Sequence, residues 1–184
     1  MQCIYFLLMT ISVFYELTGT KVMSSWHKVL KRVCNYMYVS LVFPVGMFVS
    51  FAFWGIYLVD RNLIWPVSFD SFIPKHQNHI MHTLPLIGVL IDMFVSRKTY
   101  GNSILTGYIP LFLATIGYTC WLIIIKHYTG HWVYPVFNVL SQTQLVLFFM
   151  AFNVVGAIFY VLGKHLNAYL WKKEAESKKN TKKT

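Results

Sequence analysis

Charged residues are scarce in this sequence, and acidic residues are the scarcest. Only 12% of the 184 residues are charged, with 6 Asp and Glu against 16 Lys and Arg, whereas soluble domains average about 25%. Hydrophobic residues make up 57% of the chain and aromatic residues 18%. This composition departs from that of soluble domains so far that a lipid bilayer is the expected solvent.

Several motifs that identify soluble enzymes are also missing. The three cysteines, Cys3, Cys34 and Cys120, form no C-x-x-C pair, which argues against a disulfide framework and against a cysteine zinc site. No G-x-S-x-G, Walker loop or G-x-G-x-x-G motif occurs. A soluble-type hydrolase and a nucleotide-dependent enzyme are therefore unsupported.

What the sequence does have is long apolar runs. Four of them are about long enough to cross a ~30 Å hydrocarbon core, and they occupy Tyr36–Val59, Ile80–Val95, Ile104–Ile125 and Leu145–Leu162. A fifth, Cys3–Tyr15, would cover only roughly 20 Å as a helix. We therefore predict an all-α, polytopic transmembrane bundle with five spans, the first one shortened, and a single membrane domain over residues 1–171.

The positive charges are unevenly divided between the two sides of these five spans. Thirteen of the 16 Lys and Arg, Lys98 among them, fall on the side of the C-terminus, and only Arg61, Lys75 and Lys126 fall on the other. The positive-inside rule then places the C-terminus in the cytoplasm, with residues 172–184 as a basic, disordered tail. A net charge of +10 that is distributed in this way predicts membrane lipids as partners and no nucleic acid. It specifies no protein partner.

Three histidines stand at the start of one apolar run, in the stretch PKHQNHIMHTLP at residues 74–85. A helix that begins near Pro74 would carry His76, His79 and His82 on one face, because each step of three residues turns by about 300°. His76 would lie in water and His79 at the interface, whereas His82 would lie roughly 6 Å deeper than Asn78. An intramembrane histidine is a functional-site hypothesis by default.

Two kinds of chemistry fit a histidine at that depth. A neutral imidazole can act as a base toward a hydroxyl nucleophile, for which Thr10 and Thr83 are candidates. Both threonines are more typical of helix residues that bond their own backbone, and Thr83 would point away from His82. The alternative is a mononuclear metal site formed by His79, His82 and His127, as in a metal-dependent membrane oxidase.

The two loops on the less basic side, residues 60–77 and 126–140, carry most of the remaining polar and aromatic chemistry. Because both loops lie on one side of the predicted bundle, we expect them to face each other. Asn78 and His79 would then share a pocket with two residues of the second loop, Trp132 and Tyr134.

Five motifs appear together in a recognisable order: FPVGMF at residues 43–48, DRNLIWP at 60–66, FIPKHQNHIMHT at 72–83, TGHWVYPVF at 129–137 and YVLGKHLN at 160–167. In this order and spacing they resemble the family of the androgen-induced gene product and the androgen-dependent TFPI-regulating protein (FAR-17a/AIG-like). The resemblance covers the entire chain. It implies a six-helix membrane hydrolase without a cofactor that cleaves fatty acid esters of hydroxy fatty acids (FAHFA).

The resemblance also implies which residues act. The second histidine of the N-H-x-x-H-T motif is the family's catalytic histidine, and it corresponds to His82. The family's nucleophilic threonine belongs to the pattern L-T-x-x-N-x-x-x-Q or L-T-x-x-D-x-x-x-Q, whose final Gln matches Gln2. That threonine would fall about seven residues before Gln2, and therefore before Met1.

The expected function follows from these assignments. We expect the complete protein to hydrolyse branched fatty acid esters in the endomembrane system, in the endoplasmic reticulum. The 184-residue chain would have little turnover without its nucleophile. The alternative is a catalytically inactive regulatory or scaffold membrane protein.

Overall fold

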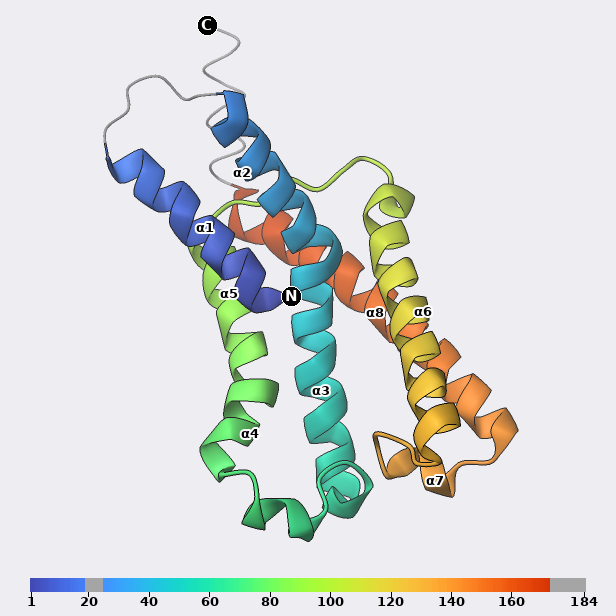
Figure 1. Cartoon of the computed structure of the whole chain (residues 1–184). Coiled ribbons are helices and arrows are strands. Elements are labelled where there is room, and N and C mark those ends of the chain that lie inside the picture. The colour runs from blue at the N-terminus through green and yellow to red at the C-terminus, as the bar shows by residue number, and fades with distance from the viewer. Residues whose placement is uncertain (19–24, 173–184) are drawn as a thin grey trace, which may run out of the picture.

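The computed structural model describes residues 1–18 and 25–172, and every regular element in them is helical (Figure 1). All but the first residue of the predicted tail, residues 172–184, lie outside the described residues. The elements in chain order are α1 (Gln2–Leu17), α2 (Ser25–Met37), the π-helix η1 (Tyr38–Val42), α3 (Phe43–Val59), the 3₁₀ helices η2 (Arg61–Leu63) and η3 (Val67–Ser71), α4 (Lys75–His82), α5 (Leu84–Val95), α6 (Ile104–Thr129), α7 (Val136–Val139) and α8 (Gln142–Leu170).

Three helical segments of the described chain are long and apolar enough to cross a membrane. They are the continuous helix over residues 25–59, α6 and α8, with 35, 26 and 29 residues. The pair α4 and α5, bent by 42°, counts as a fourth, and α1 is a shorter apolar helix. A helical membrane bundle is therefore well supported, whereas a fifth span formed by α1 stays a prediction.

Two prolines explain the irregular points in these helices. Pro44 has no N–H to give to the carbonyl of Ser40, and the helix widens into the π-turns of η1 just before it. Pro85 likewise cannot bond the carbonyl of Met81, and the helix breaks at Thr83 between α4 and α5. The second break places the histidine helix at an angle to the span that follows it.

The bundle is organised around two apolar clusters. The larger joins α1, α2, η1, α3 and α5 through Tyr5, Cys34, Tyr38, Val39, Val42, Phe43, Met47, Val89 and Met93. The smaller joins α6 to the loop that contains α7, through Leu122, Val136 and Phe137. Figure 1 shows α4 and the far end of α6 on opposite sides of α3.

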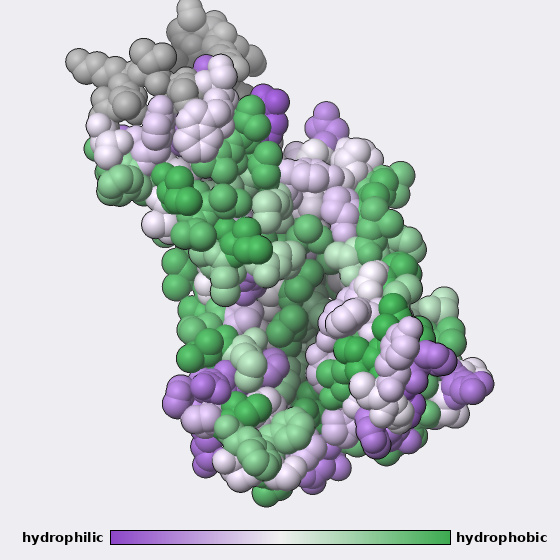
Figure 2. Space-filling view, viewed as in Figure 1, coloured by the Kyte–Doolittle hydropathy of each residue, from purple (hydrophilic) through white to green (hydrophobic). Residues whose placement is uncertain are grey.

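Large apolar side chains also cover much of the outside. Leu7, Leu58 and Val154 are among the exposed ones. In the face drawn in Figure 2, green apolar residues dominate the middle of the molecule and purple polar residues gather toward its two ends. This banded surface is what a protein solvated by lipid is expected to present.

Candidate active site

His82 is the last residue of α4, and its ring is held by two contacts. The ring stacks on that of Phe53 in α3, with centroids 3.6 Å apart and planes 8° apart. Its Nδ1 lies 2.7 Å from Asn78 Oδ1 and 3.1 Å from the Asn78 backbone oxygen. A carbonyl oxygen only accepts hydrogen bonds, so Nδ1 carries the proton and Nε2 carries the lone pair. Among the described residues, Nε2 has no hydrogen-bond partner.

His79 lies one turn earlier and is held in a parallel way. Its ring stacks on that of Trp54, with centroids 5.3 Å apart. Its Nδ1 lies 3.1 Å from Thr83 Oγ1, and Trp54 Nε1 donates to the same oxygen at 3.2 Å. Thr83 was expected to be an ordinary helix residue, and this expectation was wrong. Its hydroxyl contacts His79, one turn earlier on the same face, and not His82.

Thr10, the other threonine candidate, behaves as expected. Its hydroxyl donates to the backbone oxygen of Phe6 at 2.8 Å, which is the usual bond of a helical threonine to its own backbone. His76 lies exposed in the first turn of α4. The histidine site of this structure therefore consists of Phe53, Trp54, Asn78, His79, His82 and Thr83.

A polar loop lies beside this site. Trp65 is buried with its ring edge toward His82, at a centroid distance of 6.1 Å. Its Nε1 donates to Asp70 Oδ1 at 3.1 Å, and Arg61 forms an ion pair with the same oxygen at 2.9 Å. The hydrogen bond from Arg61 lowers the pKa of the Asp70 carboxyl below its usual value, against the smaller effect of desolvation. These contacts hold Trp65 against the histidine helix.

Trp132 and Tyr134, the predicted pocket residues of the second loop, pack against the smaller apolar cluster. The hydroxyls of Tyr134 and Tyr118 share a hydrogen bond of 2.6 Å. Leu63, from the first loop, packs against the same cluster, so the two loops do meet. A pocket that His82 shares with Tyr134 stays a prediction, because no hydrogen bond or ring contact joins these two residues.

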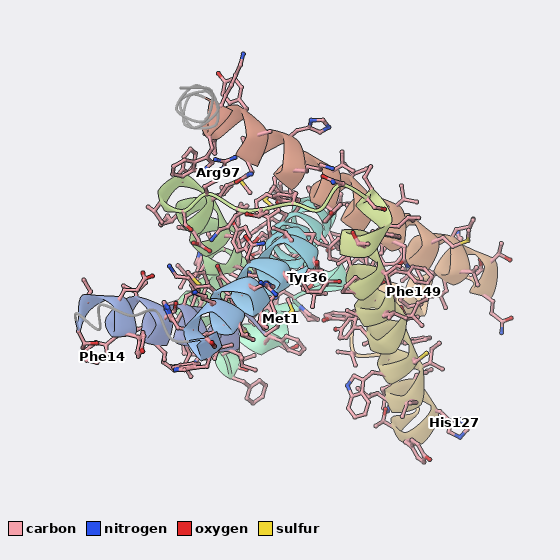
Figure 3. All side chains as sticks on the ribbon, turned by 90° about the horizontal axis from the view of Figure 1, so that it is seen from above. Met1, Phe14, Tyr36, Arg97, His127 and Phe149 are labelled. Atoms are coloured by element: carbon pink, nitrogen blue, oxygen red, sulfur yellow. The ribbon has the colours of Figure 1, made fainter. Side chains whose placement is uncertain are left out.

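The ligands of the alternative metal site do not lie together in the structure. In residues 1–18 and 25–172, no group of three or more His, Cys, Asp or Glu lies close enough to hold a metal ion. Figure 3 labels His127 at the end of α6, and α3 lies between that helix and α4 (Figure 1). The three histidines proposed as ligands therefore do not converge.

A second polar cluster, which the sequence did not reveal, lies at the other end of α5. Lys98 Nζ donates to Asp92 Oδ1 at 2.7 Å and to Tyr5 Oη at 3.2 Å, and it lies 4.2 Å from the centroid of the Tyr38 ring. Lys98 is only 4% exposed, although the sequence placed it only among the charges on the C-terminal side of the spans. We call Tyr5, Tyr38, Asp92 and Lys98 the lysine cluster.

The N-terminal helix is attached to α5 by two polar contacts. Gln2 Nε2 donates to the Pro85 backbone oxygen at 3.4 Å, and Tyr5 Oη donates to Asp92 Oδ2 at 2.5 Å. Gly46 of α3 gives Gln2 its space, because a Cβ there would collide with the Gln2 side chain. The start of α1 thus lies beside the start of α5, and Tyr5 lies beside the later residue Asp92. Met1 lies near the middle of the bundle (Figure 3).

Residues 1–168 match the family model of the FAR-17a/AIG1-like proteins. The chain belongs to this family. The resemblance inferred from its motifs is confirmed. Two human members of the family are similar to the chain. The androgen-induced gene 1 protein is 37% identical over 144 residues, which are 78% of this chain and 60% of that protein. The androgen-dependent TFPI-regulating protein is 36% identical over 155 residues, which are 84% of this chain and 67% of that protein.

The chain spans about three fifths to two thirds of the length of these family members. The golden hamster androgen-dependent TFPI-regulating protein is 31% identical over 144 residues, which are 78% of this chain and 62% of that protein. No solved structure matches the chain significantly.

Proposed function

We propose that the histidine site belongs to an intramembrane hydrolase of lipid esters, in which His82 is the general base. The observation that carries this proposal is that His82 Nδ1 lies against two oxygens of Asn78, which leaves Nε2 without a partner among the described residues. The proposed substrates, fatty acid esters of hydroxy fatty acids, come from the family resemblance. A long apolar ester could reach such a site directly from the lipid.

The direction of α1 supports a nucleophile supplied from before Met1. Between Tyr5 and Gln2 the partner on α5 changes from Asp92 to Pro85, which is toward His82. A segment that precedes Met1 in a longer chain would therefore join α1 at the end that is nearer to His82.

The proposed cycle uses one base twice. The threonine hydroxyl attacks the ester carbonyl carbon while His82 Nε2 takes its proton, which forms a tetrahedral oxyanion. The bond to the alcohol oxygen breaks, and His82 returns the proton to that oxygen, so the hydroxy fatty acid leaves and the acyl group stays on threonine. Water then attacks the acyl carbon and gives one proton to His82. The bond to the threonine oxygen breaks as His82 returns this proton to it, which releases the fatty acid and restores the threonine hydroxyl.

Hydrolysis of a branched fatty acid ester tests this function. The enzyme would be an extended chain, in which the corresponding N-terminal segment of the human androgen-induced gene 1 protein precedes Met1. We expect turnover by the extended chain and little by the 184-residue chain. His82→Ala should lower kcat by about 10²- to 10⁴-fold, the usual effect of losing a positioned base.

His76→Ala is the matched control, because His76 is exposed on the same helix and should have little effect. Full activity in His82→Ala would end the hydrolase hypothesis. Loss of activity in both variants together with chelator sensitivity would favour metal chemistry. An extended chain that is stably folded but turns over no ester would favour the regulatory or scaffold function.

The proposed location is the endoplasmic reticulum membrane, with the C-terminus in the cytoplasm and membrane lipids as partners. The orientation is supported by the distribution of Lys and Arg, because thirteen of the 16 fall on the side of the C-terminus. The endoplasmic reticulum is proposed from the family type. A C-terminal tag in intact microsomes should be open to protease. A protected tag would overturn the orientation.

A further inference from the structure

The two stacked histidines differ in the group that binds Nδ1. For His82 this group is an amide and a backbone carbonyl oxygen, which must accept. For His79 it is the Thr83 hydroxyl, which can either donate or accept. The tautomer of His79 therefore depends on what else binds that hydroxyl.

Trp54 decides the direction of the hydroxyl. An indole Nε1–H only donates, so the Thr83 oxygen accepts from Trp54. Other threonines in helices of this chain donate to a carbonyl three or four residues earlier, as Thr115 and Thr129 do. Thr83 makes no such bond among the described residues, and His79 Nδ1 is the acceptor within reach at 3.1 Å. This arrangement favours a hydroxyl hydrogen that points to Nδ1, and hence a ring proton on Nε2 of His79.

We infer that His79 is a second catalytic residue of the site, a neutral hydrogen-bond donor held in the opposite tautomer to the base His82. This inference rests on the proposed hydrolase function. His79 Nε2–H would donate to the carbonyl oxygen of the ester as it becomes negative, and Thr83 and Trp54 act as positioning residues that fix the proton on Nε2.

The geometry suits that division of roles. The two histidines are three residues apart on α4, on one helical face, and they stack on the adjacent residues Phe53 and Trp54 of α3. Both Nε2 atoms are without a partner among the described residues, so the same turn of α4 offers one acceptor and one donor. Acyl transfer needs both, because the proton of the nucleophile and the charge of the oxyanion arise in one step. A neutral imidazole can stabilise an oxyanion in this way without bringing a charge into the apolar site.

The tautomers can be measured without any activity. The 184-residue chain would be labelled with ¹⁵N-histidine in detergent micelles, and two-bond ¹H–¹⁵N correlations would distinguish the protonated from the unprotonated ring nitrogen. His79→Gln and His82→Gln would assign the signals. We expect unprotonated Nδ1 in His79 and unprotonated Nε2 in His82. A His79 that carries its proton on Nδ1, or an even mixture of tautomers, would overturn the inference.

Two variants test the cause. Thr83→Val keeps the β-branched shape without the hydroxyl, and Trp54→Phe keeps a stacked ring without the N–H. Each should shift His79 toward a mixture and leave His82 unchanged. If the wild-type tautomer of His79 persists in both variants, Thr83 and Trp54 are not the residues that fix it.

Kinetics of the extended chain separate this inference from the proposed function. A glutamine amide can place an N–H near the position of imidazole Nε2, so His79→Gln should keep at least tenfold more kcat than His79→Leu. The Leu variant should lose about 10²-fold, the usual effect of removing one oxyanion donor. His82→Gln should show no such rescue relative to His82→Leu.

Equal kcat in the wild type, His79→Gln and His79→Leu would refute the donor role, while loss in His82→Leu would leave the hydrolase intact. Equal and severe losses in His79→Gln and His79→Leu would also refute the donor role. If the extended chain turns over no ester at all, the proposed function fails, and the tautomer measurement still decides whether Thr83 and Trp54 fix His79.

Discussion

The two ends of α5 carry polar clusters of opposite character. In the lysine cluster each polar group is paired, since Lys98 reaches Asp92, Tyr5 and the face of Tyr38. In the histidine site each ring has one nitrogen bonded and the other free of partners among the described residues. Paired polar groups inside a bundle fix helices relative to one another, whereas half-paired ones remain available for chemistry.

The lysine cluster is reinforced by the loop that carries it. Asn167 of α8 bonds both the N–H and the carbonyl oxygen of Lys98, each at 2.9 Å. Asn35 of α2 does the same for Thr99, each at 2.8 Å. Two asparagines from different helices thus hold adjacent residues of the loop, and the ammonium is inserted into the bundle from a fixed backbone.

The largest effect is expected when Lys98 loses its partner Asp92. Asp92→Ala would leave a buried ammonium without its carboxylate, which should destabilise the fold by about 3–5 kcal/mol. Thermal unfolding in detergent measures this. The double variant Asp92→Leu with Lys98→Met should recover most of the loss, because it removes both charges. An Asp92→Ala protein as stable as wild type would show that the cluster fixes nothing.

Substitutions in the histidine site should change the activity of the protein and not its stability. Asn78→Leu removes the shorter of the two hydrogen bonds at His82 Nδ1 and leaves the one to the backbone oxygen, so kcat of the extended chain should fall by about 10-fold, the lower end of the loss seen when outer partners of functional histidines are removed. Gln77→Leu, at the exposed neighbouring position, is the control and should change little. Equal kcat in the two variants would contradict the role of Asn78.

Close packing between α6 and α8 gives a third test. A Cβ at Gly107 of α6 would overlap the Tyr160 side chain, whereas a Cβ at Gly117 of the same helix would meet nothing within 4 Å. Gly107→Ala should therefore destabilise by about 1–3 kcal/mol. Gly117→Ala should stabilise by about 0.5–1 kcal/mol through its helix preference. The reverse order of unfolding temperatures would refute this packing.

The smallest effect is expected at the loop beside the histidine site. Because Arg61 lowers the pKa of Asp70, the ion pair contributes stability above the unfolded pKa of about 4 and loses it as pH falls through the lower folded value. Asp70→Asn should therefore lower the unfolding temperature slightly at neutral pH, and the difference should vanish in acid. A difference that grows in acid would have the wrong sign.

Local sequence patterns predicted much of the histidine site. The residues predicted as a histidine helix from Pro74 form α4, and the residue singled out for depth, His82, is the one held by Asn78 and Phe53. Phe53 and Trp54 could not be recognised, since aromatic residues inside an apolar run resemble its lipid-facing neighbours. The role of Thr83 was also missed, because its partner Trp54 lies on another helix.

By itself, the sequence determined that this chain is a helical membrane protein of the FAR-17a/AIG1-like family, because apolar length and motif spacing are local properties of a chain. Only the tertiary structure decided that the Lys98 side chain is buried against Asp92, and that α3 presents one aromatic ring to each histidine. Those outcomes depend on contacts between segments far apart in the chain, and the free energy of such contacts exists only once the helices have packed.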